Sequence, residues 1–187
     1  MRIISGEHRG LTLASVGKGD ARAHLRPTSD RVRESLFNLL LNGSHGDPVT
    51  GARVLDLFAG TGALGLEALS RGAAHVTFVD DGVRARALIR ENIEKCRAQG
   101  VTRLFRRDAT RLGTNRAAPF DLIFLDPPYG KGLGERALAV ARSGGWIAPG
   151  ALIIWEEGNR IAVPSGFDIA DQRRYGDTEI TLLRASE

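Results

Sequence analysis

Cysteine is almost absent from this chain of 187 residues, and its scarcity excludes several classes of protein. Cys96 has no partner for an internal disulfide and no metal-ligand spacing around it, so we expect neither a disulfide framework nor a metal site. No apolar run is long enough to cross a membrane, and the opening Met1–Gly6 is not typical of a secretory signal. These absences predict a single-domain cytoplasmic protein, with Cys96 as a small core residue.

Lysine is also scarce, since only 3 of the 26 basic residues are lysine. The arginine excess runs along the whole chain, which indicates a bias in genomic base composition more than a phosphate-binding site. The net charge of +4 is not spread evenly: residues 1–33 hold seven bases and three acids, and the remaining 154 residues hold 19 of each. The positive charge at the beginning of the chain predicts contact with a polyanion there.

The first part of the chain predicts a small extension before a regular domain. Short alternating stretches at Arg2–Ser5 and Gly10–Ala14, with glycines between them, favour a hairpin. Residues Val16–Leu25 are rich in glycine and charge and have no period, which predicts a loop. Apolar residues at helical spacing then predict a helix over Thr28–Leu41, capped by one of its first three residues.

Strands and helices are expected to alternate from residue 53 onward. The expected strands are Arg53–Leu57, His75–Asp80, Thr102–Arg106, Phe120–Leu125 and Leu152–Glu156, and the expected helices are Ala63–Arg71, Val83–Ala98 and Leu133–Ser143. The tail predicts a hairpin of Phe167–Tyr175 and Thr178–Arg184 around Gly176-Asp177. The alternation predicts an α/β fold, with a mainly parallel sheet and helices on both faces.

A glycine-rich loop follows the first strand of this alternation. Gly60, Gly62 and Gly65 match G-x-G-x-x-G, the dinucleotide fingerprint, although glycines alone are weak evidence. Asp80 lies eighteen residues after Gly62 at the end of the second strand, where it would accept hydrogen bonds from ribose hydroxyls. A dinucleotide and S-adenosylmethionine would both use such an acid.

Two observations favour S-adenosylmethionine. Asp56 precedes the glycines, where a carboxylate would repel a pyrophosphate but hold an ammonium group, and the chain has no separate substrate domain. Asp108, after the third strand, is placed either to reach an adenine amino group or to cap the following turn. The residues expected to hold the cofactor are Asp56, Phe58, Ala59, Gly60, Gly62, Asp80, Asp81, Asp108 and Ala109. The strand end favours Asp80 over Asp81 as the ribose ligand.

The tetrapeptide Asp126-Pro127-Pro128-Tyr129 ends the apolar strand that precedes it. Two prolines stop a strand and leave their carbonyls free, beside a carboxylate and a flat ring. A carboxylate and a carbonyl can accept both hydrogens of an exocyclic amine while the ring stacks on its base. The alternative is a proline-terminated strand leading into an ordinary turn. The functional interpretation makes Asp126, Pro127, Pro128 and Tyr129 the candidate catalytic residues for methyl transfer to a planar amine.

The segment Arg26–Asn38, together with Asp56–Gly65 and Asp126–Tyr129, resembles the RsmD family of bacterial 16S rRNA guanine-N2 methyltransferases acting at guanine 966. The resemblance also covers Met1–Gly10 and Tyr175–Thr178. It implies a class I methyltransferase Rossmann-like fold, with a seven-stranded sheet, a reversed terminal hairpin and S-adenosylmethionine as cofactor. Its implied partner is 16S rRNA in a small ribosomal subunit particle. We expect a monomer with an RNA-contacting extension at 1–27 and a methyltransferase domain at 28–187.

The residues expected to contact RNA follow from the basic N-terminal region and the loop after Tyr129. They are Arg9, Arg22, Arg26, Thr28, Arg31, Arg33 and Lys131. The alternative for the arginines is a solvated helix face. We expect Trp146 and Trp155 to be core residues.

Other functions stay open at this point. A DNA adenine-N6 or cytosine-N4 methyltransferase would carry the same tetrapeptide. A non-catalytic nucleotide-binding module or a small NAD-dependent oxidoreductase would satisfy the glycine pattern.

Overall fold

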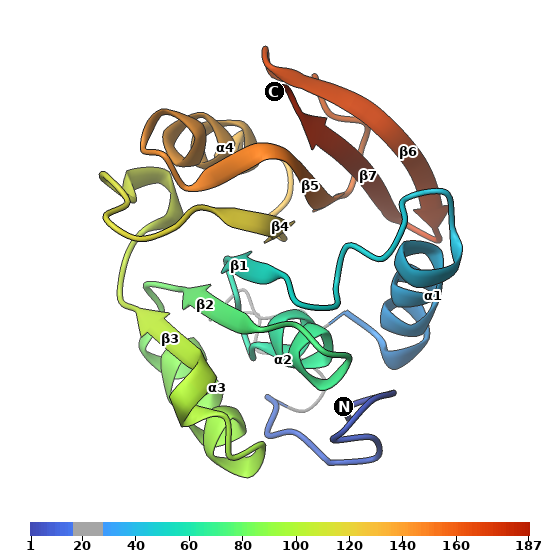
Figure 1. Cartoon of the computed structure of the whole chain (residues 1–187), viewed down its shortest axis with the longest axis vertical. Helices are drawn as coiled ribbons and strands as arrows, with labels where there is room; N and C mark the ends of the chain where they lie inside the picture. The colour runs from blue at the N-terminus through green and yellow to red at the C-terminus, as the bar shows by residue number, and fades with distance from the viewer. Residues whose placement is uncertain (17–27) are drawn as a thin grey trace.

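One sheet of seven strands organises the molecule in the computed structural model, which describes residues 1–16 and 28–187 (Figure 1). Its order is β3-β2-β1-β4-β5-β7-β6. The strands are β1 (Arg53–Leu57), β2 (His75–Val79), β3 (Thr102–Phe105), β4 (Phe120–Leu125), β5 (Ile147–Glu157), β6 (Phe167–Tyr175) and β7 (Thr178–Ala185). The helices are α1 (Asp30–Asn42), α2 (Ala63–Ser70), α3 (Val83–Lys95) and α4 (Leu133–Ser143), with short 3₁₀ turns η1 (Gln99–Val101) and η2 (Ala109–Arg111).

The strand directions bring the loops that follow the parallel strands to one edge of the sheet. Strands β1 to β5 pair in parallel, whereas β7 runs antiparallel between β5 and β6. The carboxyl ends of the five parallel strands therefore meet at the same edge, where ligands bind in open α/β sheets. The expected mainly parallel sheet with a reversed terminal hairpin is confirmed.

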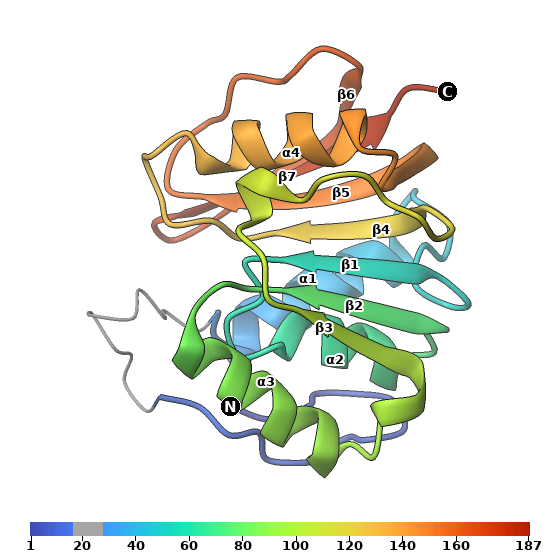
Figure 2. The ribbon, with the colours of Figure 1, turned by 90° about the vertical axis from the view of Figure 1, so that its left-hand side faces the viewer.

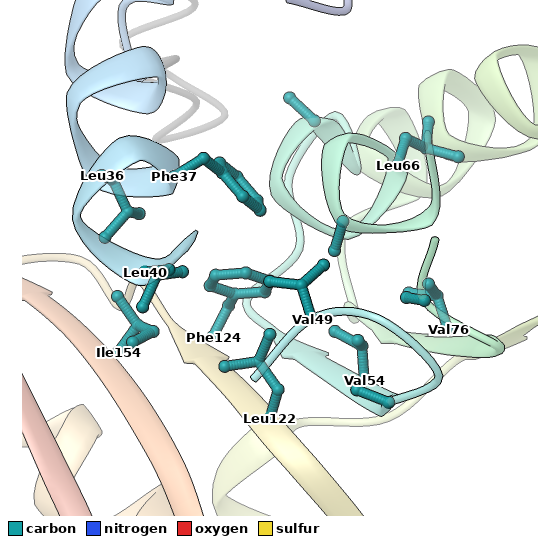
Figure 3. Close-up of a cluster of buried hydrophobic side chains, with 14 of the residues drawn as sticks. Leu36, Phe37, Leu40, Val49, Val54, Leu66, Val76, Leu122, Phe124 and Ile154 are labelled. Carbon is teal, nitrogen blue, oxygen red and sulfur yellow. The ribbon is translucent and has the colours of Figure 1, made fainter. Parts of the chain in front are cut away.

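Two layers of apolar side chains cover the two faces of the sheet. On one face, α1, α2 and α3 pack on alternate strand residues, and Phe37 meets Phe124 with 5.9 Å between ring centroids (Figure 3). On the other face, α4 packs around the fully buried Trp155. Figure 2 shows α4 in front of the sheet and α1 behind it. Trp146, Trp155 and Cys96 are all buried, as expected.

The N-terminal segment, residues 1–14, folds back on itself but forms no regular strand. Its backbone bonds include Ile3 N–H to the Leu11 carbonyl at 2.9 Å, with a single antiparallel bridge between Arg2 and Thr12. Ile3 and Leu13 are buried in the core shared with α1, α2 and α3. The expected hairpin therefore exists as a folded-back segment that belongs to the main core.

Element boundaries differ from the expected ones by a few residues. Helix α3 ends at Lys95, three residues early, because Arg97 takes a left-handed φ of 51°. Strand β5 begins at Ile147, five residues before the expected start. Ser29 is the cap of α1, accepting a hydrogen bond from Val32 N–H at 3.3 Å. Within the described residues, no helix is long and apolar enough to cross a membrane.

Candidate active site

The glycine loop between β1 and α2 needs its glycines for close packing and for backbone shape. Gly60 and Gly62 have φ values of 59° and 77°, in the left-handed region. Gly65 allows α2 to approach the sheet, because an added Cβ there would lie 2.5 Å from Phe78 Cε1. Phe58 also has a positive φ, 58°, which is uncommon for an aromatic residue. Such strain indicates a loop shaped for a ligand.

Asp56 is buried at the end of β1. Its Oδ2 accepts a hydrogen bond from Gly65 N–H at 3.0 Å. Burial, and then the charge of Asp80, raise the pKa of Asp56 to about 8, although the Gly65 bond opposes the shift. A ligand ammonium group would favour the ionised form of this carboxyl. As a hydrogen-bond acceptor, the Asp56 carboxylate therefore fits the ammonium group of S-adenosylmethionine.

Asp80 joins the glycine loop to the residue that precedes α3. Its two carboxyl oxygens accept hydrogen bonds from Gly60 N–H at 2.9 Å and from Gly82 N–H at 2.8 Å. Burial raises the pKa of Asp80, and these two hydrogen bonds oppose the shift. Asp81 is exposed, and its carbonyl accepts a hydrogen bond from Arg86. Asp80 is thus the more constrained of the two candidate ribose ligands.

A cavity of about 200 Å³ opens beside these strand ends. It is lined by Phe58, Val79, Asp80, Asp81, Arg107, Asp108, Ala109, Pro128 and Leu133. Five of these are residues expected to hold the cofactor, and Pro128 comes from the expected catalytic tetrapeptide. Asp56, Ala59, Gly60 and Gly62 belong to the β1 end and the glycine loop, next to the lining residue Phe58. The structure thus brings the residues of four loops, those after β1, β2, β3 and β4, to one cavity.

Asp108 caps the turn that follows it and also faces the cavity. Its Oδ1 accepts hydrogen bonds from Thr110 N–H at 2.8 Å and from the Thr110 hydroxyl at 2.7 Å, so it caps η2. It also lines the cavity. Burial opposes ionisation, but the Thr110 bonds and the nearby Arg111 and Arg136 hold the pKa of Asp108 below its ordinary value. An ionised Asp108 can accept a hydrogen bond from an adenine amino group.

The tetrapeptide follows β4 directly, next to the end of β1. Asp126 N–H approaches the Leu57 carbonyl at 3.4 Å. Burial, and then the charges of Glu156, Asp56 and Glu157, raise the pKa of Asp126 well above its ordinary value. The loop is therefore an acidic, acceptor-rich site bordering the cavity.

Sequence reasoning missed the residues at the end of β5. Glu156 accepts a hydrogen bond from the Tyr129 hydroxyl at 2.7 Å, and Glu157 accepts one from Gly130 N–H at 3.1 Å. Thr178, at the start of β7, lies 3.3 Å from the same Tyr129 hydroxyl. The signal was present, because a strand ending in two acids points to the same carboxyl edge as the other strand ends.

Asn92, which is fully buried on α3, is a second missed residue. Its side chain accepts from Ala14 N–H at 2.7 Å and donates to the Ala14 carbonyl at 3.0 Å and to the Thr61 carbonyl at 2.9 Å. It therefore joins the N-terminal segment to the glycine loop. The Thr61 hydroxyl adds a contact to Met1 Sδ at 3.5 Å.

The residues expected to contact RNA fall into several groups. Arg9 and Arg31 are exposed and line a cleft of about 390 Å³ between the N-terminal segment and α1. Lys131 is exposed beside the tetrapeptide loop. Thr28 donates its hydroxyl hydrogen to Glu156 at 3.0 Å. Arg22 and Arg26 lie outside the described residues, as does most of the expected loop at 16–25.

The assignment of Arg33 to the RNA surface is wrong. Its side chain is fully buried, with Nη2 2.5 Å from Asp30 Oδ1 and 2.8 Å from the Arg2 carbonyl. Its Nη1 lies 3.7 Å from Glu67 Oε2. Arg33 falls on the same helical stripe as Leu36, Phe37 and Leu40, which face the core. That spacing was visible in the sequence, and it outweighs the residue's charge.

Comparison with known proteins agrees with this geometry. A family model described as "Conserved hypothetical protein 95" matches residues 1–184. "Ribosomal RNA small subunit methyltransferase D" of Escherichia coli is 36% identical, over 98% of this chain and 89% of the relative. "Putative rRNA methyltransferase YlbH" of Bacillus subtilis is 34% identical, over 98% of both chains.

A solved structure described as a putative methyltransferase, yhhF, from Escherichia coli has the same fold. It is 34% identical, covers 100% of this chain and 98% of its own, and superposes with a TM-score of 0.84. Its likeness extends over the whole sheet and the N-terminal segment. With the fold, the strand-end acids and the family model in agreement, the chain belongs to the RsmD methyltransferase family.

Proposed function

We propose that this protein transfers a methyl group from S-adenosylmethionine to the exocyclic N2 of a guanine, of the guanine 966 type, in 16S rRNA. Family membership supports the reaction class, methyl transfer from S-adenosylmethionine, and relatives carry the name of ribosomal RNA methyltransferases. The proposal goes further in three respects: guanine is the target base, its N2 is the methylated atom, and the rRNA is presented on a small-subunit particle.

The observation that carries the proposal is the shared wall of the cavity. Pro128 of the tetrapeptide lines the same cavity as Asp80 and Asp108. A cofactor bound in this cavity would therefore lie next to the tetrapeptide that is expected to hold the target amine. This adjacency suits direct transfer between two bound molecules, because reacting atoms must be held within about 3–3.5 Å.

The charges near Asp126 favour guanine over adenine or cytosine. The groups that raise the pKa of Asp126, after burial, are the carboxylates Glu156, Asp56 and Glu157. Guanine presents donors at both N1 and N2, whereas adenine and cytosine present a ring nitrogen lone pair beside the amino group. An ionised Asp126 and the Pro127 carbonyl, both acceptors, would pair with the first arrangement and repel the second.

The protein's own groups then have defined roles. The cofactor supplies an electrophilic methyl group on a sulfonium. Asp126 and the Pro127 carbonyl accept the two N2 hydrogens, which localises the nitrogen lone pair for attack. As the new N–C bond forms and the C–S bond breaks, N2 becomes positively charged and loses a proton to solvent or to Asp126. Tyr129 stacks on the base, which has left its helix at a cost of a few kcal/mol.

The test is methyl transfer to three substrates: small ribosomal subunits, free 16S rRNA and duplex DNA. We expect N2-methylguanosine on nucleoside analysis of the product, with subunits preferred over free rRNA. N6-methyladenine or N4-methylcytosine in DNA would refute the base assignment. A parallel binding measurement uses S-adenosylmethionine and NAD, and binding of NAD alone would refute the cofactor.

A further inference from the structure

The ring of Tyr129 is held by residues from two other strands. Its hydroxyl donates to Glu156 Oε1 at 2.7 Å and lies 3.3 Å from Thr178 Oγ1. Burial, and then the Glu156 charge, raise the pKa of Tyr129, so the hydroxyl keeps its proton and remains a donor. The hydroxyl end of the ring is therefore fixed to the ends of β5 and β7.

A glycine fixes the edge of the same ring. At Gly158 an added Cβ would lie 2.9 Å from Tyr129 Cδ2, so the ring packs directly against this backbone. Glu157 Oε1 holds the position by accepting from Gly158 N–H at 2.9 Å and from Gly130 N–H at 3.1 Å. The loop that carries Tyr129 and the end of β5 are thus tied together at both backbone and side chain.

Glu156 also reaches the beginning of α1. Its second oxygen, Oε2, accepts from the Thr28 hydroxyl at 3.0 Å, across 128 residues of sequence. Thr28 directly precedes Ser29, the cap of α1, and Arg31 on that helix is exposed. One carboxylate therefore joins the ring beside Asp126 to the start of the helix that presents a candidate RNA contact.

We propose that Glu156 is a positioning residue for target-base stacking: it fixes the plane of the Tyr129 ring and couples that plane, through Thr28, to the start of α1. The inference rests on the proposed function, since it assigns Tyr129 to the target base. It requires that loss of Glu156 lowers the rate of RNA methylation and leaves the affinity for S-adenosylmethionine unchanged. A mispositioned ring is costly because a shift of about 1 Å in a reacting group can reduce a rate about 100-fold.

The charge of Glu156 predicts a change in the pH dependence of the rate, which a residue that only packs against Tyr129 would not cause. Asp126 is faced by Glu156 and Glu157 at the end of β5, by Asp56 at the end of β1 and by Tyr129 on its own loop. Replacing Glu156 by glutamine removes the foremost of these charges, so the Asp126 carboxyl ionises at a lower pH. The acid limb of the rate profile should move in the same direction.

The test is a double-mutant cycle with Glu156→Gln and Tyr129→Phe, measured by single-turnover methylation of small ribosomal subunits and by calorimetric binding of S-adenosylmethionine. We expect each single variant to lose about 10- to 100-fold in rate and the double variant to lose no more than the worse single. The reason is that both variants act on the same hydrogen bond: Tyr129→Phe removes its donor, and Glu156→Gln weakens it by replacing a charged acceptor with a neutral one. Cofactor affinity should stay within about twofold, and the acid limb of Glu156→Gln should shift to lower pH. Glu94→Gln, at an exposed acid on α3, controls for lost charge.

A second variant keeps the inference testable if Glu156→Gln does not fold. Gly158→Ala displaces the ring without altering any charge, so it should lower the rate and leave the pH profile in place. Additive losses in the cycle, or equal losses of cofactor affinity, would overturn the positioning role. The product made by the wild-type protein is identified first, so that a wrong base refutes the proposed function and a failed cycle on guanine refutes only Glu156.

Discussion

The two halves of the sheet's carboxyl edge are held together in different ways. In the cofactor half, at the ends of β1 and β2, carboxylates accept hydrogen bonds from backbone N–H groups close in sequence. Asp56 binds Gly65 nine residues away, and Asp80 binds Gly60 and Gly82 at separations of 20 and two residues. These three hydrogen bonds stay within the strand ends and loops of this half.

In the target half, at the ends of β4, β5 and β7, side chains bind other side chains from distant segments. Tyr129 and Glu156 are 27 residues apart, Tyr129 and Thr178 are 49 apart, and Thr28 and Glu156 are 128 apart. Such contacts form only once the whole sheet has assembled. Under the proposed function, cofactor binding would depend mainly on contacts within the loops, whereas the geometry of the target site would depend on the complete fold.

The sharpest test of this division is Asp126→Ala. We expect a rate loss of at least about 100- to 1000-fold, because the variant removes an acceptor that acts only on the reacting amine. Cofactor affinity should change less than about twofold. Single-turnover methylation and calorimetry measure the two quantities, and Asp168→Ala, at an exposed acid on β6, is the control. If cofactor binding is lost as well, the two halves are not separable.

Asp80→Asn and Asp81→Asn should differ within the cofactor half. Asp80 holds Gly60 and Gly82 by backbone hydrogen bonds, so its variant should weaken cofactor binding about 10- to 100-fold. Asp81 is exposed, and its variant should cost less than about threefold. Calorimetric titration with S-adenosylmethionine compares them. Equal effects would mean that both acids contact the ribose.

The pH dependence of stability should report on Asp56. Burial raises the pKa of Asp56 to about 8 from 3.8, so between these values the folded protein holds a proton that the unfolded chain has released. The contribution of this group to stability therefore falls as pH rises through that window. Between pH 6 and 8 the free energy of unfolding of the wild-type protein should fall by about 2 kcal/mol more than that of Asp56→Asn. Urea unfolding at each pH measures both. If the two proteins show the same dependence of stability on pH, the pKa of Asp56 is not raised.

The smallest effect is expected at Arg31, outside both halves. Its side chain is exposed beside the cleft next to the N-terminal segment. Arg31→Ala should weaken rRNA binding about threefold and reduce the slope of log affinity against log salt by about 1. Filter binding over a salt series measures both, with Arg90→Ala on α3 as a matched exposed control. An unchanged slope would return Arg31 to a solvated helix face.

The same division explains how much the sequence alone could predict. The acids of the cofactor half follow strands at regular spacing, and their partners are nearby backbone groups, so residue order was enough to place Asp56, Asp80 and Asp108. Tyr129 was placed as well, because its tetrapeptide ends a strand. Its hydrogen-bond partners were not predicted, since nothing local in the sequence connects Tyr129 with Glu156 or Thr178.

Arg33 shows a different reason for error. Its charge suggested a surface role, whereas its position on the apolar stripe of α1 buries it against Glu67. A buried arginine is stable only with acidic partners, and Arg33 has two of them. Asp30 lies on the same helix, 2.5 Å from Arg33 Nη2, whereas the fully buried Glu67 comes from α2 and lies 3.7 Å from Arg33 Nη1. Helical spacing indicated the burial, but only the assembled fold brings Glu67 to it.

Glu67 has a consequence for how the chain is made. It accepts Ile4 N–H at 2.8 Å and Ser5 N–H at 3.1 Å, and Asn92 then binds the backbone of Ala14. During synthesis, Ser5 and Ala14 therefore wait for partners made 62 and 78 residues later. Until α2 and α3 have emerged, the N-terminal segment has no place to dock, and it completes the core only after those helices form.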